Sequence, residues 1–457
     1  MEATIQKVWN SSKLLVKAMI IGIIVLILQI PTYYVKEIII EREARQKEAI
    51  TEVSSRWAGK QNIAGPLLVL PYWQYAPDTA TGRSGVKQYA YFLPDELKIK
   101  SEISPEEKYR GIYKVMLYSS RVNLAGSYKG IQLDKLGIDP GTVIWNEALV
   151  KISIADAKGL NDDVRIRWNG QSLPVDAESA PAFGSEEGII APLNLNGYDD
   201  VKNMSFNIDL DISGSEQLLF TPLGKSTTVD MSAKWPHPSF TGAVLPLSTD
   251  IKKDSFSAQW KTVALKRNFP QQWKNNAFNT DMAHINKTLP SDPNSLQPVL
   301  TNHISQASFG TNLFVPVNGY QKTMRSVKYA ALCILLTFAA FFIIDTTNKR
   351  SVHPFQYGLI GLALVLFYTL LLSFSEYVGF NVSYVIASVC TIGLIAWFVN
   401  GILASSRLTT ILSVVLFLMY TYVFTILQLQ DYSLILGSIG LFITLAVIMH
   451  FSKKIQW

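Results

Sequence analysis

Cysteine is nearly absent from this chain of 457 residues. Its two cysteines, Cys333 and Cys390, both fall inside long apolar runs, and the polar stretch from residue 36 to residue 325 contains none. A disulfide framework in that stretch is therefore excluded, and so is a metal site built from cysteine thiolates.

The motifs of common enzyme classes are missing as well. The sequence has no G-x-S-x-G nucleophile elbow, no H-E-x-x-H and no phosphate-binding G-x-x-x-x-G-K-[ST] pattern. None of the five histidines has a second histidine at the short spacing of a helical zinc site. We therefore assign no catalytic, cofactor-binding or metal-ligating residue, and we expect no cofactor.

Blocks of basic residues are also lacking. The formal net charge is +6, and no five or six cations follow one another. Such blocks are typical of segments that bind nucleic acid, so a nucleic-acid partner is not indicated.

What the sequence does contain is long apolar runs. Each is close to the roughly 17 to 25 residues that span a bilayer. The runs are residues 14–30, 327–344, 355–374, 382–399, 408–427 and 434–451. The first is too long for a signal peptide and no small-x-small cleavage site follows it, so we expect an uncleaved anchor. The sequence thus predicts a bundle of six transmembrane helices.

The cations predict how these helices are oriented. Four groups lie at alternate ends of the runs: Lys7 with Lys13 and Lys17, Lys349 with Arg350, Arg407, and Lys453 with Lys454. Because cytoplasmic loops carry the excess of Lys and Arg, both termini are expected in the cytoplasm. Residues 36–325 then lie on the other side, which is the periplasm in a two-membrane bacterium. The predicted domains are 1–35, 36–325 and 326–457.

The middle domain is expected to be a helical stalk followed by a large all-β domain. Residues 36–57 keep a helical pattern, and apolar residues then alternate with period two at 113–117, 150–154, 164–168, 206–212, 229–235 and 256–260. Asn169-Gly170 predicts a hairpin, and Asn196-Gly197 and Ser213-Gly214 predict further turns. So many half-buried strands favour a β-sandwich or two packed β-lobes. Residues 266–303 show no period and predict a long surface segment, and a last strand is expected within 309–320.

One loop of this domain is a candidate interaction site. Pro236 and Pro238 fix the backbone and remove two N–H donors, which ends a strand at Trp235. The resulting extended loop carries His237 and ends at Phe240. It is interpreted either as a strand terminator that closes the sandwich or as a recognition edge.

Two carboxylates lie near the ends of the apolar runs. Glu376 follows the third run, where it has either a proton or ligand role or the simpler role of an interfacial group. Asp345 follows the second run, and we expect it to be solvated at the opposite interface.

Several short motifs, in this order and spacing, make the chain similar to a known family. They are Gly111-Ile112-Tyr113, residues 235–240, Lys328-Tyr329-Ala330, Thr337-Phe338 with Phe341-Phe342, His353-Pro354 with Gln356-Tyr357, and residues 362–376 followed by Gly379-Phe380. The chain resembles the CreD family of bacterial inner-membrane proteins, which is linked to cell-envelope integrity. The resemblance implies an inner-membrane location, a role in envelope stress and no catalytic residues.

Three hypotheses follow for the function. In the first, a non-catalytic membrane protein contacts the lipid bilayer and displays a periplasmic β-domain that binds an envelope protein, a lipid or a cell-wall component. In the second, the chain is a transporter or lipid-handling protein whose β-domain receives cargo. In the third, carboxylates that the sequence alone does not pair form the site of an envelope hydrolase.

Overall fold

The chain divides into two compact units in the computed structural model. The model describes residues 16–75, 85–161, 164–175, 188–275, 277–278, 280–282, 304–313, 319–347, 352–429, 435–440, 442, 446 and 449. One unit comprises the chain up to Glu48 and from Val317 onward, and the other comprises Ala49–Pro316.

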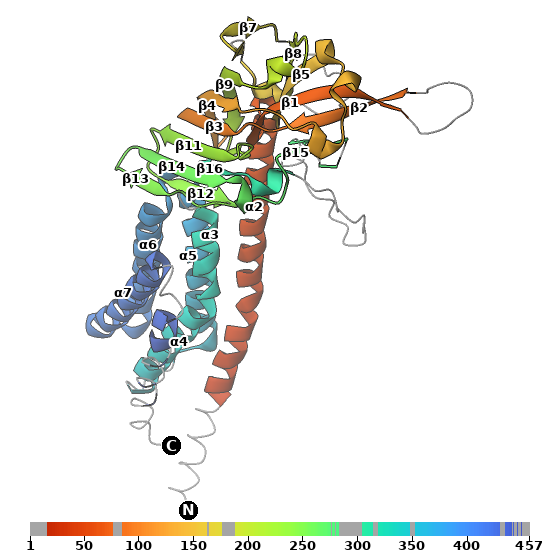
Figure 1. Ribbon diagram of the computed structural model, residues 1–457. Helices are drawn as coiled ribbons and strands as arrows, with labels where there is room; N and C mark the ends of the chain where they lie inside the picture. The colour runs from red at the N-terminus through yellow and green to blue at the C-terminus, as the bar shows by residue number, and fades with distance from the viewer. Residues whose placement is uncertain are drawn as a thin grey trace, which may run out of the picture. The chain divides into compact units, whose positions relative to one another are not determined.

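The first unit consists of helices, most of which contain a long apolar run. A first helix runs from Val16 to Trp57, and its part from Gln29 onward is α2 (Figure 1). The later helices are α3 (Gly319–Lys328), α4 (Ala330–Thr347), α5 (Pro354–Val378), α6 (Phe380–Leu403) and α7 (Ser406–Gln428). Among the described residues, four helices are long and apolar enough to cross a membrane, or five if α3 and α4, bent by 45°, form one span.

Five of the six predicted apolar runs coincide with these helices. The sixth run, residues 434–451, lies mostly outside the described residues, although residues 435–440 are helical. Six membrane-spanning helices therefore stay a prediction. The helical pattern expected for residues 36–57 is confirmed, because α2 continues to Trp57.

Local chemistry explains why the helices are separated by such short breaks. Pro354 begins α5, where its fixed φ suits the first helical position. The His353 ring accepts the Phe355 N–H at 3.2 Å, and the Gln356 side chain accepts the His353 N–H at 3.1 Å. Gly379, with φ of +78°, separates α5 from α6. The start of α5 is thus specified by a cap and a proline, and the break between α5 and α6 by a glycine.

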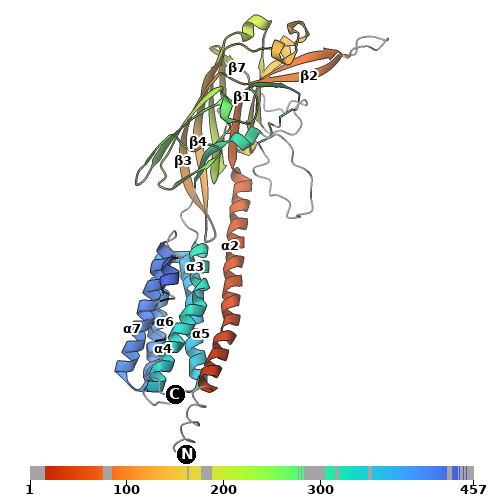
Figure 2. The ribbon, with the colours of Figure 1, turned by 60° about the horizontal axis from the view of Figure 1, so that its bottom comes forward.

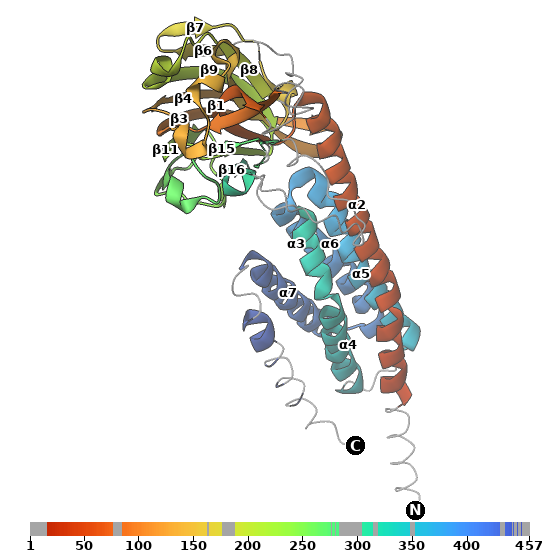
Figure 3. The same cartoon turned by 45° about the vertical axis from the view of Figure 1, so that its right-hand side comes forward.

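Close packing joins the first helix to α4 and α5. A Cβ added at Gly361 would lie 2.1 Å from Leu28 Cδ1 and 2.9 Å from Phe338 Cζ, so any larger residue would force these side chains to shift. Figure 3 shows the first helix running beside α5 and the bend between α3 and α4. Farther along α5, Phe367 packs against Tyr384 of α6 and Tyr420 of α7, with ring centroids 5.3 and 4.6 Å apart.

The second unit contains two eight-stranded sheets. In the first, the order is β12-β16-β10-β1-β2-β15, and β5 pairs with both β1 and β8. Its strands are β1 (Gln61–Tyr75), β2 (Gly85–Phe92), β5 (Ala148–Ile154), β8 (Gly188–Leu193), β10 (Gln217–Phe220), β12 (Pro238–Gly242), β15 (Gln272–Lys274) and β16 (Phe309–Leu313). Most pairs are antiparallel, but β1 and β10 run parallel.

The second sheet has the order β13-β14-β11-β3-β4-β9-β6-β7. Its strands are β3 (Glu96–Arg110), β4 (Tyr113–Tyr128), β6 (Arg165–Trp168), β7 (Gln171–Leu173), β9 (Met204–Ser215), β11 (Ser226–Ala233), β13 (Ser248–Ile251) and β14 (Phe256–Val263). β3 and β4 form a long hairpin, visible in Figure 2. β11 pairs with β3 in parallel, although the two are far apart in the sequence.

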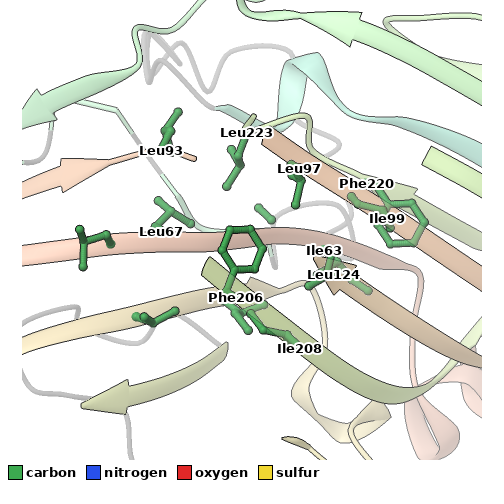
Figure 4. Close-up of a cluster of buried hydrophobic side chains, with 14 of the residues drawn as sticks. Ile63, Leu67, Leu93, Leu97, Ile99, Leu124, Phe206, Ile208, Phe220 and Leu223 are labelled. Carbon is green, nitrogen blue, oxygen red and sulfur yellow. The ribbon is translucent and has the colours of Figure 1, made fainter. Parts of the chain in front are cut away.

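One hydrophobic core lies between the two sheets. Leu67 and Phe220 of the first sheet meet Leu124 and Phe206 of the second in Figure 4, and all four are buried. Alternate residues of β11 and β14 are buried in strict period two. The predicted all-β domain is therefore confirmed, and its sheets are arranged like a sandwich.

The turn predictions had mixed outcomes. Asn169 and Gly170 both have positive φ in the β6–β7 hairpin, as predicted. The turn expected at Ser213-Gly214 is wrong, because both residues lie within β9, where Gly214 packs under the Tyr118 ring. The strand expected to end at Trp235 ends two residues earlier, at Ala233.

The segment expected to be irregular from residue 266 is partly structured. β15 pairs with β2, and its Trp273 is buried and stacks on Tyr91 at 5.4 Å. Arg267 donates to the carbonyl oxygens of Pro222, at 3.0 Å, and Leu223. Burial lowers the pKa of the Arg267 guanidinium to about 10. The expectation of a surface segment without regular structure is thus wrong for 267–275, and residues 283–303 lie outside the described part.

A glycine in the β3–β4 hairpin gives a first prediction. A Cβ at Gly126 would lie 2.0 Å from the Glu96 carbonyl oxygen and 2.6 Å from Phe206 Cζ, and the backbone oxygen cannot swing aside. Gly126→Ala is therefore expected to destabilise the domain by about 1–3 kcal/mol. Denaturant unfolding of the full chain measures this. Gly197→Ala, where a Cβ would meet nothing within 4 Å, should be neutral, and equal stability of the two variants would contradict the clash.

Candidate functional site

Glu376 lies near the C-terminal end of α5 in a polar cluster of the helical unit. Its side chain is only 10% exposed. The Tyr320 hydroxyl of α3 donates to Glu376 Oε1 at 2.9 Å, and Arg42 Nε of α2 lies 3.9 Å from the same oxygen. Side chains from three helices therefore meet at one carboxylate. The sequence analysis singled out this carboxylate but did not identify its partners.

Amide groups extend this cluster on the neighbouring helices. Lys322 Nζ of α3 donates to Gln428 Oε1 of α7 at 3.4 Å, and Gln428 Nε2 donates to Asn381 Oδ1 of α6 at 2.7 Å. The Lys322 ammonium also lies 5.5 Å from the centroid of the Phe380 ring. This end of the helical unit thus presents a carboxylate, two cations and two amides.

A second polar cluster surrounds Asp345 at the end of α4. Asp345 forms an ion pair with Lys17 of the first helix, and its side chain is 3% exposed. It also accepts the Tyr357 hydroxyl at 3.2 Å and the Val352 N–H at 3.3 Å. The expectation that Asp345 is solvated is wrong, because its side chain is buried and bonded to Lys17 of the first helix and to two groups at the start of α5. No sequence pattern links Lys17 to Asp345 across so many residues.

The 235–240 loop connects the two sheets of the β unit. The indole N–H of Trp235 donates to the His237 carbonyl oxygen at 3.1 Å, and Pro236 lies in the bend. Pro238 begins β12, and Phe240 packs edge-to-face on Trp260 of β14 at 5.5 Å. The aromatic side chains therefore serve the fold, while His237 is exposed.

The second sheet carries a polar outer face that sequence reasoning missed. Directly opposed residues form one row across five strands: Asp230 of β11, Lys100 of β3, Asn123 of β4, Asp209 of β9 and Arg165 of β6. Alternation along single strands indicated outward polar residues, but their alignment depends on a strand order that the sequence does not give. We call this surface the polar sheet face.

Three adjoining hollows run along the polar sheet face. Their volumes are about 390, 430 and 390 Å³, and Glu102 of β3 lines all three. The first includes Arg121 and Asp211, and the last ends at Lys234, the residue before Trp235. Within the described residues, no group of three or more His, Cys, Asp or Glu side chains could hold a metal ion.

Comparison with known proteins identifies the family. A family model described as "Inner membrane protein CreD" matches residues 13–457. The chain belongs to the CreD family. It is 29% identical over 446 residues to the inner membrane protein CreD of Escherichia coli K12, covering 95% of this chain and 91% of that protein. Together with the apolar helices, this makes the chain a membrane protein of an inner-membrane family, as the resemblance implied.

A solved structure shares only a weak likeness with this CreD-family chain. It is described as a nutrient-binding protein from Legionella pneumophila, and it matches 48% of this chain and 71% of its own at 7% identity. The TM-score is 0.22, so the match supports no conclusion about fold or function.

Several of the motifs that carry the CreD resemblance fall at turns and breaks, whereas Thr337-Phe338 and residues 362–376 lie within α4 and α5. Gly111, with φ of +61°, forms the β3–β4 turn. Tyr329 separates α3 from α4, His353 caps α5, and Gly379 separates α5 from α6. In this CreD-family chain these four residues therefore lie where the backbone turns or a helix begins or ends.

The Glu376 cluster yields a stability prediction. Glu376→Ala removes the carboxylate to which the Tyr320 hydroxyl donates, and we expect a loss of stability of about 1–3 kcal/mol. Removing Arg42 should cost less than about 1 kcal/mol, because that contact is long and Arg42 is partly exposed. Unfolding of the purified chain in detergent measures both. Glu376→Gln keeps the acceptor and should retain most of the stability, so an equal loss in the two Glu376 variants would contradict this account.

Proposed function

We propose that the chain is a non-catalytic inner-membrane protein that supports cell-envelope integrity. Its β-domain, within residues 36–325, is displayed in the periplasm and binds an envelope component there. The observation that carries the proposal is the polar sheet face, a broad hydrophilic surface with three adjoining hollows. The domain is joined at both of its ends to apolar helices, which suits a receptor held near the membrane.

The binding surface includes the polar sheet face and the neighbouring loop at residues 235–240. The face offers donors and acceptors of both signs, with Lys100 and Arg121 beside Glu102 and Asp209. Mixed polar surfaces of this kind fit a hydrated partner that forms hydrogen bonds. His237 extends the surface past Lys234, at the end of the third hollow.

Site-specific crosslinking in cells tests this proposal. A photoreactive residue is placed at Asn123 on the polar sheet face, at His237 in the loop, and at Lys135, an exposed control position outside the hollows. We expect one envelope component to be captured from Asn123 and His237 and none from Lys135. A triple variant, Lys100→Ala, Glu102→Ala and Arg121→Ala, should abolish capture at Asn123. Equal capture from all three positions would refute a specific surface.

The proposed orientation is tested separately. The ion pair between Lys17 and Asp345 supports it, because it joins the start of the first span to the end of α4, which the topology puts on one side of the membrane. Compartment-sensitive reporters fused near residue 200 and at Trp457 should report opposite compartments. Labelling of both in the same compartment would overturn the periplasmic location.

A further inference from the structure

The short helix α3 has one buried face and one basic face. Tyr320, Thr323, Ser326 and Val327 are its buried residues. Its cations follow at a spacing of three: Lys322, Arg325 and Lys328. Successive cations are about 60° apart around the helix axis, so all three fall within an arc of about 120°. The helix is therefore amphipathic, with its charge concentrated away from the packed side.

These cations are not used in ion pairs within the described part of the chain. No described carboxylate lies within 4.0 Å of Lys322, Arg325 or Lys328, whereas Arg42 approaches Glu376. The contacts recorded for Lys322 are the Gln428 side chain and the Phe380 ring. Among the residues that the structure describes, no carboxylate therefore neutralises the charge on this face of α3.

The position of α3 indicates what that partner is. One residue, Tyr329, separates it from α4, an 18-residue helix without Lys or Arg, and the two helices bend by 45°. A basic amphipathic helix that leads directly into an apolar membrane span lies at the membrane interface, at the depth of the lipid phosphates. The other residues at this end, Asn381 and Gln428, are at the termini of the apolar helices α6 and α7.

We propose that α3 is a binding site for anionic phospholipid headgroups, in which Lys322, Arg325 and Lys328 neutralise lipid phosphates. The chemistry is charge complementarity at the membrane surface, where each nearby Lys or Arg changes affinity by about five-fold. The neighbouring amides add polar groups able to bond a glycerol headgroup. We expect selectivity for a net negative lipid over a zwitterionic one, because three clustered cations attract a lipid with net negative charge and repel a choline or ethanolamine cation.

The test uses the purified full chain in detergent with two added lipids, phosphatidylglycerol and phosphatidylcholine, and counts bound lipids by native mass spectrometry. We expect the wild-type chain to prefer phosphatidylglycerol. Single Gln substitutions at the three cations should each weaken that preference by about five-fold. The triple variant, Lys322→Gln, Arg325→Gln and Lys328→Gln, should lose it, while Lys322→Arg with Lys328→Arg should keep it.

A matched variant separates local binding from net charge. Lys135→Gln, Lys225→Gln and Lys266→Gln remove three exposed cations from the β unit and should leave the lipid preference unchanged. The proposal is overturned if the α3 triple variant prefers phosphatidylglycerol as strongly as the wild type, or if both triple variants lose the preference equally. It is also overturned if millimolar inorganic phosphate displaces the lipid completely, since the site would then recognise a free anion.

Discussion

Replacing Asp345 with alanine is expected to reduce the stability of the helical unit by about 3–5 kcal/mol, because it leaves a partly buried cation without its partner. Lys17 is 24% exposed on its side chain and forms its ion pair with Asp345. The Tyr357 hydroxyl, which donates to Asp345 at 3.2 Å, would lose its acceptor as well. Most of this loss of stability comes from leaving the Lys17 charge without a partner, and less comes from losing the attraction between Lys17 and Asp345.

A double substitution separates the cost of the unpaired Lys17 charge from the lost attraction between Lys17 and Asp345. Lys17→Met with Asp345→Leu removes both charges and replaces them with apolar side chains of similar length. Because a buried ion pair can be exchanged for apolar packing at little cost, the double variant should recover most of the stability lost by Asp345→Ala. A double variant as unstable as the single one would mean that the carboxylate has an additional role in packing around Tyr357.

The measurement is unfolding of the full chain in detergent micelles, followed by the ellipticity of its helices. The exposed pair between Glu41 and Arg45 on α2, both more than half exposed, provides the comparison. Glu41→Ala should change stability by less than about 1 kcal/mol, since exposed pairs contribute little. Equal effects at Asp345 and Glu41 would contradict the burial of the first pair.

Sequence periodicity predicted the elements better than their partners. The six alternating stretches all became strands, because a half-buried strand must repeat every two residues. Pairing was not predictable, since β11 lies beside β3 in parallel and β1 beside β10, and neither pair follows from chain order. The misplaced turn at Ser213-Gly214 has the same origin: a small residue in β9 marks where Tyr118 passes close, which local propensity does not reveal.

The candidate sites show the same division. Glu376 could be singled out because a carboxylate at the end of an apolar run is unusual. Its partner Tyr320, like the partner of Asp345, comes from a distant segment and is chosen by helix packing. The aromatic residues of the 235–240 loop were conspicuous for their composition, but Phe240 is explained by the core. Composition therefore locates unusual residues, while only the fold assigns their partners.

Trp260 is the residue of the β unit whose removal should cost most. It is fully buried on β14, its ring lies 5.8 Å from Phe309 of β16, and Phe240 of β12 packs against its face. Its indole N–H also donates to the Val244 carbonyl at 3.2 Å. The side chain therefore bridges the two sheets, and Trp260→Ala is expected to destabilise the domain by about 3–5 kcal/mol.

Graded substitutions show which part of Trp260 matters. Trp260→Phe keeps a ring between the sheets but removes the N–H that donates to the Val244 carbonyl. It should therefore keep much of the stability that Trp260→Ala loses. Trp73, which is 40% exposed, is the matched control, and Trp73→Ala should change stability much less. Denaturant unfolding of the full chain measures all three. A Trp260→Ala variant as stable as Trp73→Ala would contradict this account. It would mean that the sheets close the space left by the ring, and that the packing of Trp260 of β14 on β12 and β16 does not stabilise the sandwich.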